Sequence, residues 1–222
     1  MSKALRNWIA GALGHAPADL ASYERALTHG SQAAANYERL EFLGDRVLGL
    51  VMAEWLYALY PKEPEGALSR RLNTLVTGAA CADVARALGV PAQLRLGKQA
   101  RDDGAADSDN VLGDVMEALI GALYLDVGLE AARSAIRTAW GDRPMRATAA
   151  PLHPKSALQE WAAANNRKAP AYEVVDRSGP HHAPRFIVKA TLGGFAEAQA
   201  EGGSKQEAET AAAAALLAKV TG

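Results

Sequence analysis

The sequence predicts two domains: an N-terminal all-α domain and a smaller C-terminal α+β domain with the order α-β-β-β-α. Residues 1–140 consist mainly of long apolar-rich stretches separated by Gly and Pro, and they lack the alternation typical of strands. After residue 154 the pattern changes to three short, partly alternating segments between two helical ones. A length of 222 residues, with 49% hydrophobic and 22% charged residues, suits two small globular domains.

Six helices are expected in the first domain. Their approximate ranges are residues 3–13, 23–30, 37–60, 65–88, 111–125 and 130–140. Pro61 ends the third helix and Pro91 follows the end of the fourth, because proline cannot continue the hydrogen bonding of a helix. The polar segment 98–110 carries four aspartates and is expected to be a loop, whose end supplies Ser108 and Asp109 as candidate N-caps.

A linker is expected at residues 144–153, between a first domain at 1–143 and a second at 154–222. Residues 141–154 hold three of the ten prolines and a run of small residues. The second domain is expected to contain a helix, three strands and a final helix, at residues 156–164, 172–175, 185–191, 195–200 and 205–220. The alanine run in the last segment is a strong helix former.

Composition limits the classes of protein to which the chain can belong. Its single cysteine, Cys81, excludes an intramolecular disulfide and a zinc site built from several cysteines, and it favours a reducing compartment. No stretch reaches the ~18 uninterrupted apolar residues that a membrane span needs, and the N-terminus lacks the continuous apolar segment of a signal peptide. A cytoplasmic protein without membrane attachment is therefore expected.

Net charge argues against a general nucleic-acid binder. The whole chain carries −1; residues 1–151 have 16 Lys and Arg against 18 Asp and Glu, and residues 152–222 have 8 against 7. Any surface that binds nucleic acid must therefore come from the local placement of basic residues.

Three carboxylates share one side of the third predicted helix. At about 100° per residue, Glu38, Glu41 and Asp45 fall within about 60° of one another. The rest of this helix is almost wholly apolar, which is typical of a buried helix, and carboxylates there are costly to desolvate without a counter-charge. A divalent cation would supply that charge.

The helix predicted at residues 111–125 repeats this arrangement. Asp114 and Glu117 are three residues apart, on a face that also carries Gly113 and Gly121, whose small size lets another backbone or a ligand come close. If the two acidic faces meet, they form one cluster of Glu41, Asp45, Asp114 and Glu117. Such a site has only oxygen ligands, which Mg²⁺ or Mn²⁺ prefer. Either acidic pair alone is more often a solvated helix face, and the spacing leaves both interpretations open.

Two motifs resemble those of a known family. Residues 36–48 are Asn-Tyr-Glu-Arg-Leu-Glu-Phe-Leu-Gly-Asp-Arg-Val-Leu, which closely resembles the signature of bacterial ribonuclease III. Residues 114–121 are Asp-Val-Met-Glu-Ala-Leu-Ile-Gly, which resembles that family's second acidic motif, and the resemblance extends over nearly the whole chain. It implies an all-α endonuclease domain, a Mg²⁺-dependent activity that cuts double-stranded RNA, and a homodimer.

The resemblance also implies roles for individual residues. The four matching metal ligands are Glu41, Asp45, Asp114 and Glu117. Of these, Asp45 and Glu117 are also expected to be catalytic. Glu38 and Glu65 are further catalytic candidates, because they match acidic positions that line the family's cleavage groove. Phe42 matches an aromatic residue that enters a socket on the second subunit; the alternative is an ordinary core residue.

The implied mechanism uses water activated by metal ions and no protein nucleophile. The resemblance also implies products with a 5′-phosphate and a 3′-hydroxyl. Expected substrates are precursors of rRNA, mRNA and other structured transcripts. Mn²⁺ is the expected substitute for Mg²⁺, and no small-molecule cofactor is expected.

The sequence departs from the family at Arg46 and at residues 69–73, and neither change removes a metal ligand. His29 could be a general base, or it could have a structural role in its turn.

The second domain resembles a double-stranded-RNA-binding domain, a module that recognises the shape of A-form RNA. The residues that match its RNA contacts are Lys155, Ser156, Gln159, Glu160, His182, Ser204 and Lys205. The ordinary alternatives are an exposed turn at His182 and a plain N-cap at Ser204. Gln206 stands where the family commonly has a second lysine, which predicts a weaker RNA affinity and a shallower salt dependence.

Two other functions remain open from the sequence. A non-catalytic regulator that binds double-stranded RNA on the same fold would have lost a metal ligand, whereas all four acids are present. A magnesium-dependent hydrolase of small phosphates, from another all-α family, would gain little from an RNA-binding domain.

Overall fold

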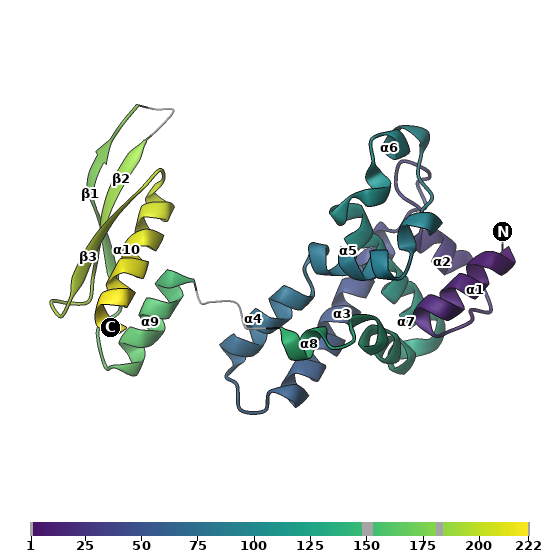
Figure 1. Ribbon diagram of the computed structural model, residues 1–222, viewed down its shortest axis with the longest axis horizontal. Coiled ribbons are helices and arrows are strands. Elements are labelled where there is room, and N and C mark those ends of the chain that lie inside the picture. The colour runs from purple at the N-terminus through teal and green to yellow at the C-terminus, as the bar shows by residue number, and fades with distance from the viewer. Residues whose placement is uncertain (1, 148–152, 181–183, 222) are drawn as a thin grey trace. The chain divides into compact units, whose positions relative to one another are not determined.

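Two units, each with its own hydrophobic core, make up the computed structural model shown in Figure 1. The structure describes residues 2–147, 153–180 and 184–221. The first unit spans Met1–Ala150, and the second spans Pro151–Gly222. No helix among the described residues is long and apolar enough to cross a lipid bilayer.

The first unit is built from helices. They are α1 (Ser2–Leu13), α2 (Ala21–Ala26), α3 (Glu38–Leu59), α4 (Glu65–Leu75), α5 (Gly78–Ala87), α6 (Lys98–Asp102), α7 (Asp109–Trp140) and α8 (Arg143–Arg146). Two short 3₁₀ helices, η1 (Val90–Gln93) and η2 (Ala105–Asp107), lie between them. Apolar side chains of the two longest helices, α3 and α7, form much of the core; Leu48, Val51 and Leu119 are fully buried. The all-α prediction is confirmed.

The backbones of α3 and α7 touch where the two helices cross. A methyl group on Gly44 would overlap the carbonyl oxygen of Glu117 and lie 2.5 Å from its carbonyl carbon. A methyl group on Gly121 would overlap the carbonyl oxygen of Leu40. Only glycine permits this approach, which brings the acidic residues near each glycine to one crossing point.

The helix predicted at residues 65–88 is interrupted, so this prediction is wrong. The chain breaks between α4 and α5 at Thr77, which is extended with φ −67° and ψ 152°. The hydroxyl oxygen of Thr77 accepts a hydrogen bond from the amide of Ala80 at 3.1 Å, so it caps a new helix. The loop predicted at residues 98–110 also needs correction, because it contains the helices α6 and η2.

The helices predicted at residues 111–125 and 130–140 are both present, joined in α7. Gly128 separates them with φ 81° and ψ −176°, a conformation that glycine adopts readily and other residues rarely. Ser108 lies at the N-cap of α7, as predicted, but its side chain makes no capping hydrogen bond.

Helix α8 lies within the stretch predicted as a linker. Pro144 is buried, and the hydroxyl of Tyr60 donates a hydrogen bond to its carbonyl oxygen at 3.0 Å. Pro144 therefore packs on the first unit, whereas Met145 and Arg146 are exposed. Residues 148–152 lie outside the described part of the chain, and the domain limits stay a prediction.

The second unit combines three strands and two helices in the predicted order. They are α9 (Pro154–Ala164), β1 (Ala171–Ser178), β2 (Arg185–Thr191), β3 (Glu197–Gly202) and α10 (Lys205–Thr221). The strands form an antiparallel sheet in the order β1-β2-β3, in which Val188 pairs with Val174 and Ala200. Leu158 of α9 and Leu216 of α10 are fully buried against this sheet. The predicted α+β class is confirmed.

Candidate active site

Acidic residues of α3 and α7 lie together at the crossing of the two helices. Glu41, Asp114 and Glu117 are half-buried. Burial, and then the charges of Glu41 and Asp114, raise the pKa of Glu117 from 4.5 to about 7. Burial, followed by the charges of Asp114 and Glu38, raises the pKa of Glu41, and burial also raises the pKa of Asp114. The cluster therefore holds negative charge that its surroundings do not balance.

Asp45 lies on the same helix but pairs with another group. Its carboxylate forms an ion pair with Arg46, and its side chain is 39% exposed. Its charge is not among those that raise the pKa of the other three acids. In the described part of the chain, no group of three or more His, Cys, Asp or Glu side chains is arranged so that it could hold a metal ion. The charges of Glu41, Asp114 and Glu117 thus act on one another, whereas the carboxylate of Asp45 is paired with Arg46.

The donor set of this cluster suits a hard divalent cation. All of its donors are carboxylate oxygens, the ligands that Mg²⁺ and Mn²⁺ prefer. Among the described hydrogen bonds, none joins a basic side chain to Glu41, Asp114 or Glu117. Burial raises the pKa values of all three groups, and like charges add to this at Glu41 and Glu117. A cation with two charges would offset both effects. Asp45 could complete the set after turning away from Arg46.

Two neighbours of the cluster were not predicted from the sequence. The hydroxyl of Tyr37 donates a hydrogen bond to Oδ2 of Asp114 at 3.3 Å. The thiol of Cys81, on α5, is fully buried and donates to Oε1 of Glu117 at 3.8 Å. Burial, and then the charge of Glu117, raise the pKa of Cys81 to about 12, so the thiol stays neutral at physiological pH. Cys81 is therefore a hydrogen-bond donor to Glu117 and not an activated nucleophile.

His29 lies beside the cluster but is held within its own turn. Its Nδ1 accepts a hydrogen bond from the amide of Ser31 at 3.0 Å and lies 2.8 Å from the Ser31 hydroxyl. Its ring packs against that of Tyr37, with 5.8 Å between the ring centres. These contacts favour the structural role over the role of a general base.

The two other predicted acids lie at helix starts. Glu38 is the exposed first residue of α3, and its charge adds to those that raise the pKa of Glu41, after burial and Asp114. Glu65 is the exposed first residue of α4 and accepts a hydrogen bond from the Ser69 hydroxyl at 2.6 Å. No described hydrogen bond or ion pair joins Glu65 to the cluster. Its role in a cleavage groove stays a prediction.

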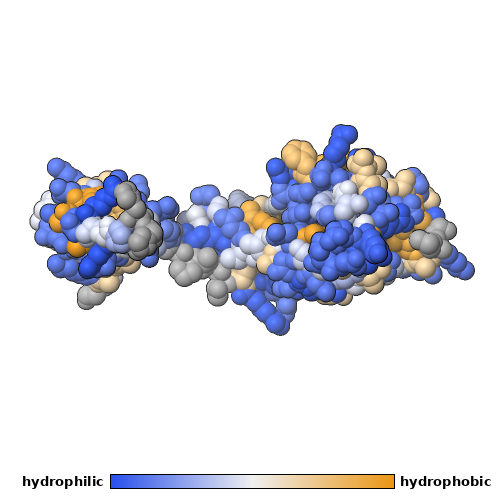
Figure 2. All heavy atoms as spheres, turned by 90° about the horizontal axis from the view of Figure 1, so that it is seen from above, coloured by the Kyte–Doolittle hydropathy of each residue, from blue (hydrophilic) through white to orange (hydrophobic). Residues whose placement is uncertain are grey.

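Phe42 is a surface residue. Its side chain is 65% exposed, so the alternative of an ordinary core residue is wrong. Leu125 of α7 is also exposed, and both residues line a hollow of about 630 Å³. Figure 2 shows one face of the surface, where hydrophobic patches lie among hydrophilic residues. The role of Phe42 at a subunit interface stays a prediction.

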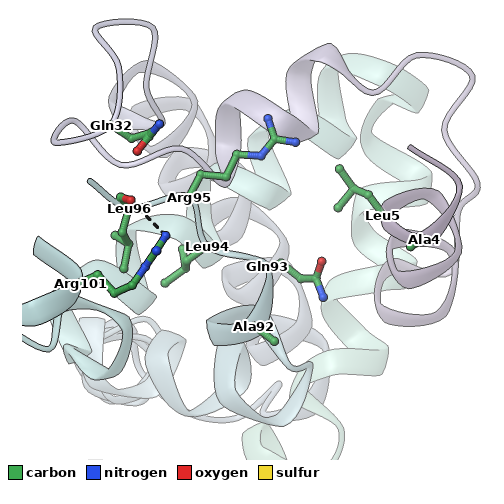
Figure 3. A pocket seen from close by; sticks show the side chains of 9 residues that line it. All are labelled: Ala4, Leu5, Gln32, Ala92, Gln93, Leu94, Arg95, Leu96 and Arg101. Atoms are coloured by element: carbon green, nitrogen blue, oxygen red, sulfur yellow. Dashed lines mark hydrogen bonds between the residues drawn. The ribbon is translucent and has the colours of Figure 1, made fainter. Parts of the chain in front are cut away.

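The pocket in Figure 3 is separate from the acidic cluster. It lies between α1, η1 and α6, and no acidic side chain of the described residues lines it. Its two arginines already have partners: Arg101 donates to the carbonyl oxygen of Leu96 at 3.2 Å, and Arg95 pairs with Glu24 at 2.8 Å. The pocket offers no group suited to hydrolysis, so the acidic cluster is the better candidate site.

In the second unit, one carboxylate forms ion pairs with both of the lysines that are predicted to contact RNA. Glu209, which is only 16% exposed, lies 2.7 Å from the ammonium of Lys155 and 3.8 Å from that of Lys205. Lys155 also lies over the ring of Tyr172, at 4.7 Å from its centre. A lysine of α9 and a lysine of α10 are thereby brought to one place.

Two side chains at the start of α10 accept hydrogen bonds from backbone amides. The hydroxyl oxygen of Ser204 accepts one from the Glu207 amide at 3.1 Å, and the Glu207 carboxylate accepts one from the Gly203 amide at 2.8 Å. Ser204 is therefore a helix cap, whatever else it binds. On α9, Ser156, Gln159 and Glu160 are exposed, whereas His182 lies outside the described residues.

Comparison with known proteins identifies both units. Residues 19–141 match the family model described as Ribonuclease-III-like, and residues 154–220 match the double-stranded RNA binding motif. Ribonuclease 3 of Zymomonas mobilis is 62% identical over 211 residues, which cover 95% of this chain and 86% of that protein. The chain belongs to the ribonuclease III family.

Other members of the ribonuclease III family support the same assignment. Ribonuclease 3 of Azorhizobium caulinodans is 49% identical over 214 residues, covering 93% of this chain and 91% of the relative. A crystal structure of the nuclease domain of ribonuclease III from Campylobacter jejuni superposes with a TM-score of 0.57 at 32% identity, covering 61% of this chain and 95% of that one. The chain is thus an endoribonuclease whose second domain binds double-stranded RNA, and the enzyme is favoured over the non-catalytic regulator.

Proposed function

We propose that the enzyme cuts double-stranded RNA with Mg²⁺ held at the crossing of α3 and α7. The proposed ligands are Glu41, Asp45, Asp114 and Glu117. The observation that carries this proposal is the half-buried cluster of carboxylates, in which burial, and then the charges of Glu41 and Asp114, raise the pKa of Glu117 to about 7. Such a cluster is costly without a cation, and its oxygen donors suit Mg²⁺, with Mn²⁺ as the substitute.

The residues of the chain have distinct parts in this proposal. A bound divalent cation lowers the pKa of water and stabilises charge on the scissile phosphate. Glu41 and Asp45 of α3 and Asp114 of α7 would hold the cation, with Asp45 released from its pair with Arg46. Glu117 would hold it as the ionised carboxylate, which the Cys81 thiol contacts. Attack by water on phosphorus forms a new P–O bond and breaks the bond between phosphorus and the 3′ oxygen, which takes up a proton. The products therefore carry a 5′-phosphate and a 3′-hydroxyl. Glu38 and Glu65 would line the groove that receives RNA.

A homodimer fits the need for two cuts, one in each strand. The exposed ring of Phe42 and the neighbouring Leu125 offer an apolar surface for a second subunit. The nuclease domain of ribonuclease III from Campylobacter jejuni shows structural flexibility in a region involved in its dimer formation. The proposed substrates are rRNA precursors, mRNA and other structured transcripts, and the cytoplasmic location expected from the sequence stays a prediction.

Incubation with a long RNA duplex, with and without Mg²⁺, tests the proposed function. Single-stranded RNA and duplex DNA of the same sequence are the controls. We expect cutting of the RNA duplex alone, only with Mg²⁺ or Mn²⁺, and products that a 5′-phosphate-dependent exonuclease degrades. Cutting in the presence of a chelator, or products with a 3′-phosphate, would contradict the proposal.

Replacing Arg46 by alanine should make the metal bind more tightly. The Arg46–Asp45 pair is exposed, with side chains 63% and 39% accessible, and such pairs are worth about 0–1 kcal/mol. Its removal frees Asp45, so the Mg²⁺ concentration that gives half-maximal cleavage should fall by up to about fivefold. Arg86→Ala, which removes the exposed pair with Asp109, is the control and should leave this concentration unchanged. If the Arg46→Ala variant instead needs a higher Mg²⁺ concentration for half-maximal cleavage, Arg46 assists metal binding.

Deletion of residues 152–222 should separate binding from cleavage. The first unit has its own core, and we expect it to fold without the second. Loss of the RNA-binding domain should weaken duplex binding by at least about tenfold at physiological salt, while cleavage stays detectable at low salt, where electrostatic attraction is stronger. Gel shift and cleavage assays over a salt series measure both effects. A folded first unit that is inert at every salt concentration would place the active site elsewhere.

A further inference from the structure

One side chain, Tyr37, connects the start of α3 to the acidic face of α7. Its hydroxyl donates to Oδ2 of Asp114 at 3.3 Å, and the residue is only 7% exposed. Among the described residues, Tyr37 is the only side chain that donates a hydrogen bond to Asp114. The other carboxylate oxygen, Oδ1, accepts no described hydrogen bond and is free to bind a ligand.

The position of Tyr37 is fixed by its backbone and by its ring. Its amide donates to the carbonyl oxygen of Thr28 at 3.1 Å, which ties it to the turn that precedes α3. Its carbonyl oxygen accepts hydrogen bonds from the amides of Leu40 and Glu41, at 2.8 and 2.9 Å, in the first turn of the helix. Its ring packs at 55° against that of His29. The hydroxyl is thereby held in one place and cannot follow Asp114 if that carboxylate turns.

A fixed donor matters because Asp114 lies among like charges. Glu41 and Glu117 belong to the same cluster, and repulsion favours rotation of the Asp114 side chain away from them. Hydrogen bonds to a ligand from outside the metal site hold its orientation, and their loss typically weakens metal binding about 10–100-fold. We infer that Tyr37 is a positioning residue, whose hydroxyl holds Asp114 in the orientation that binds the metal. This inference rests on the proposed function.

The chain contains a matched control for this hydrogen bond. Tyr23 is fully buried, and its hydroxyl donates to Oδ2 of Asp126 at 3.0 Å. Asp126 pairs with His15 and does not belong to the acidic cluster. Tyr23→Phe therefore removes the same type of bond, from a tyrosine to an aspartate, at a place where no metal is proposed.

The test compares the full-length wild type with Tyr37→Phe and Tyr23→Phe. Calorimetric titration with Mn²⁺, without RNA, measures metal affinity. Cleavage rates over a series of Mg²⁺ concentrations measure how much metal the reaction requires. We expect Tyr37→Phe to raise both the Mn²⁺ dissociation constant and the Mg²⁺ concentration for half-maximal rate by about 10–100-fold. Its rate at saturating Mg²⁺ should stay within a few-fold of the wild type. Tyr23→Phe should match the wild type in both metal measurements.

Four results would overturn the inference. A Tyr37→Phe protein with wild-type metal affinity would show that the hydroxyl does not position Asp114. An equal loss of affinity in Tyr23→Phe, or a Tyr37→Phe protein whose melting temperature shows it unfolded, would assign Tyr37 a purely structural role. A wild type that binds no Mn²⁺ and cuts RNA in a chelator would refute the proposed metal site as well, so the two failures are distinguishable.

Discussion

Glu117→Gln is expected to abolish cleavage, with a rate loss of at least about 10³-fold, because each 1.36 kcal/mol of lost stabilisation costs tenfold and a metal supplies several. Glutamine keeps the shape of the side chain but cannot offer a charged oxygen to a cation. Duplex binding should stay within about twofold of the wild type, because the second domain is unchanged. Single-turnover cleavage and gel shift assays measure the two effects. Residual cleavage at more than a tenth of the wild-type rate would contradict the role of Glu117.

The same variant has a predicted pH signature in stability. The pKa of Glu117 in the folded protein, about 7, is above its ordinary value of 4.5, so folding favours the protonated form. Without metal, the wild type therefore loses stability as pH rises from about 4.5 to 7, and the loss is complete above pH 7. Glutamine does not titrate. Metal-free Glu117→Gln should thus melt at a higher temperature than the wild type at pH 8, with a smaller difference at pH 4.5.

Glu130→Gln is the matched control for both measurements. Glu130 lies on the same helix, is 83% exposed and pairs with Arg133, whose hydrogen bond lowers its pKa. Its substitution should leave cleavage unchanged and should not raise the melting temperature at pH 8. A rise equal to that of Glu117→Gln would show that the effect comes from the net charge of the protein and not from the cluster.

Gly44→Ala is expected to reduce both stability and activity. A methyl group at this position overlaps the carbonyl oxygen of Glu117, and backbone cannot move aside as a flexible side chain can. Overpacking of this kind costs about 1–3 kcal/mol, more than the roughly 1 kcal/mol that alanine gains over glycine in a helix. Separation of α3 from α7 also displaces the carboxylates, and a shift of about 1 Å can lower a rate about 100-fold.

Gly49→Ala distinguishes this clash from the general effect of alanine. Gly49 lies on the same helix, five residues later, and a methyl group there meets nothing within 4 Å. This substitution should be neutral or should stabilise the protein by up to about 1 kcal/mol, with unchanged cleavage. Urea denaturation of both variants measures the difference. Equal stability of the two variants would show that the helices do not cross in backbone contact at Gly44.

The sequence predicts the acidic cluster because both helices have a strong and simple pattern. Spacings of three and four residues place Glu38, Glu41 and Asp45 on one side of a helix whatever its neighbours are. Small residues on the second helix indicate close packing, and Gly121 indeed meets the backbone of α3. The break at Thr77 also has a local signal, an N-cap residue, which the apolar periodicity of residues 65–88 obscures.

Other features of the site depend on contacts that no local pattern contains. Tyr37 and Asp114 are 77 residues apart, and Cys81 and Glu117 are 36 apart, so only the packing of α3, α5 and α7 brings them together. The ion pair between Asp45 and Arg46 depends on the directions in which these two adjacent side chains point. Helical spacing fixes the face on which a residue lies but does not fix the orientation of its side chain.

A crystal of the enzyme grown with Mn²⁺ and measured for anomalous scattering tests the metal site most directly. We expect an anomalous peak at the crossing of α3 and α7, within bonding distance of carboxylate oxygens from both helices, with the Asp45 side chain turned away from Arg46. The peak should vanish in Glu117→Gln. A crystal of protein that cuts duplex RNA in Mn²⁺ but shows no peak between these helices would refute the proposed metal site.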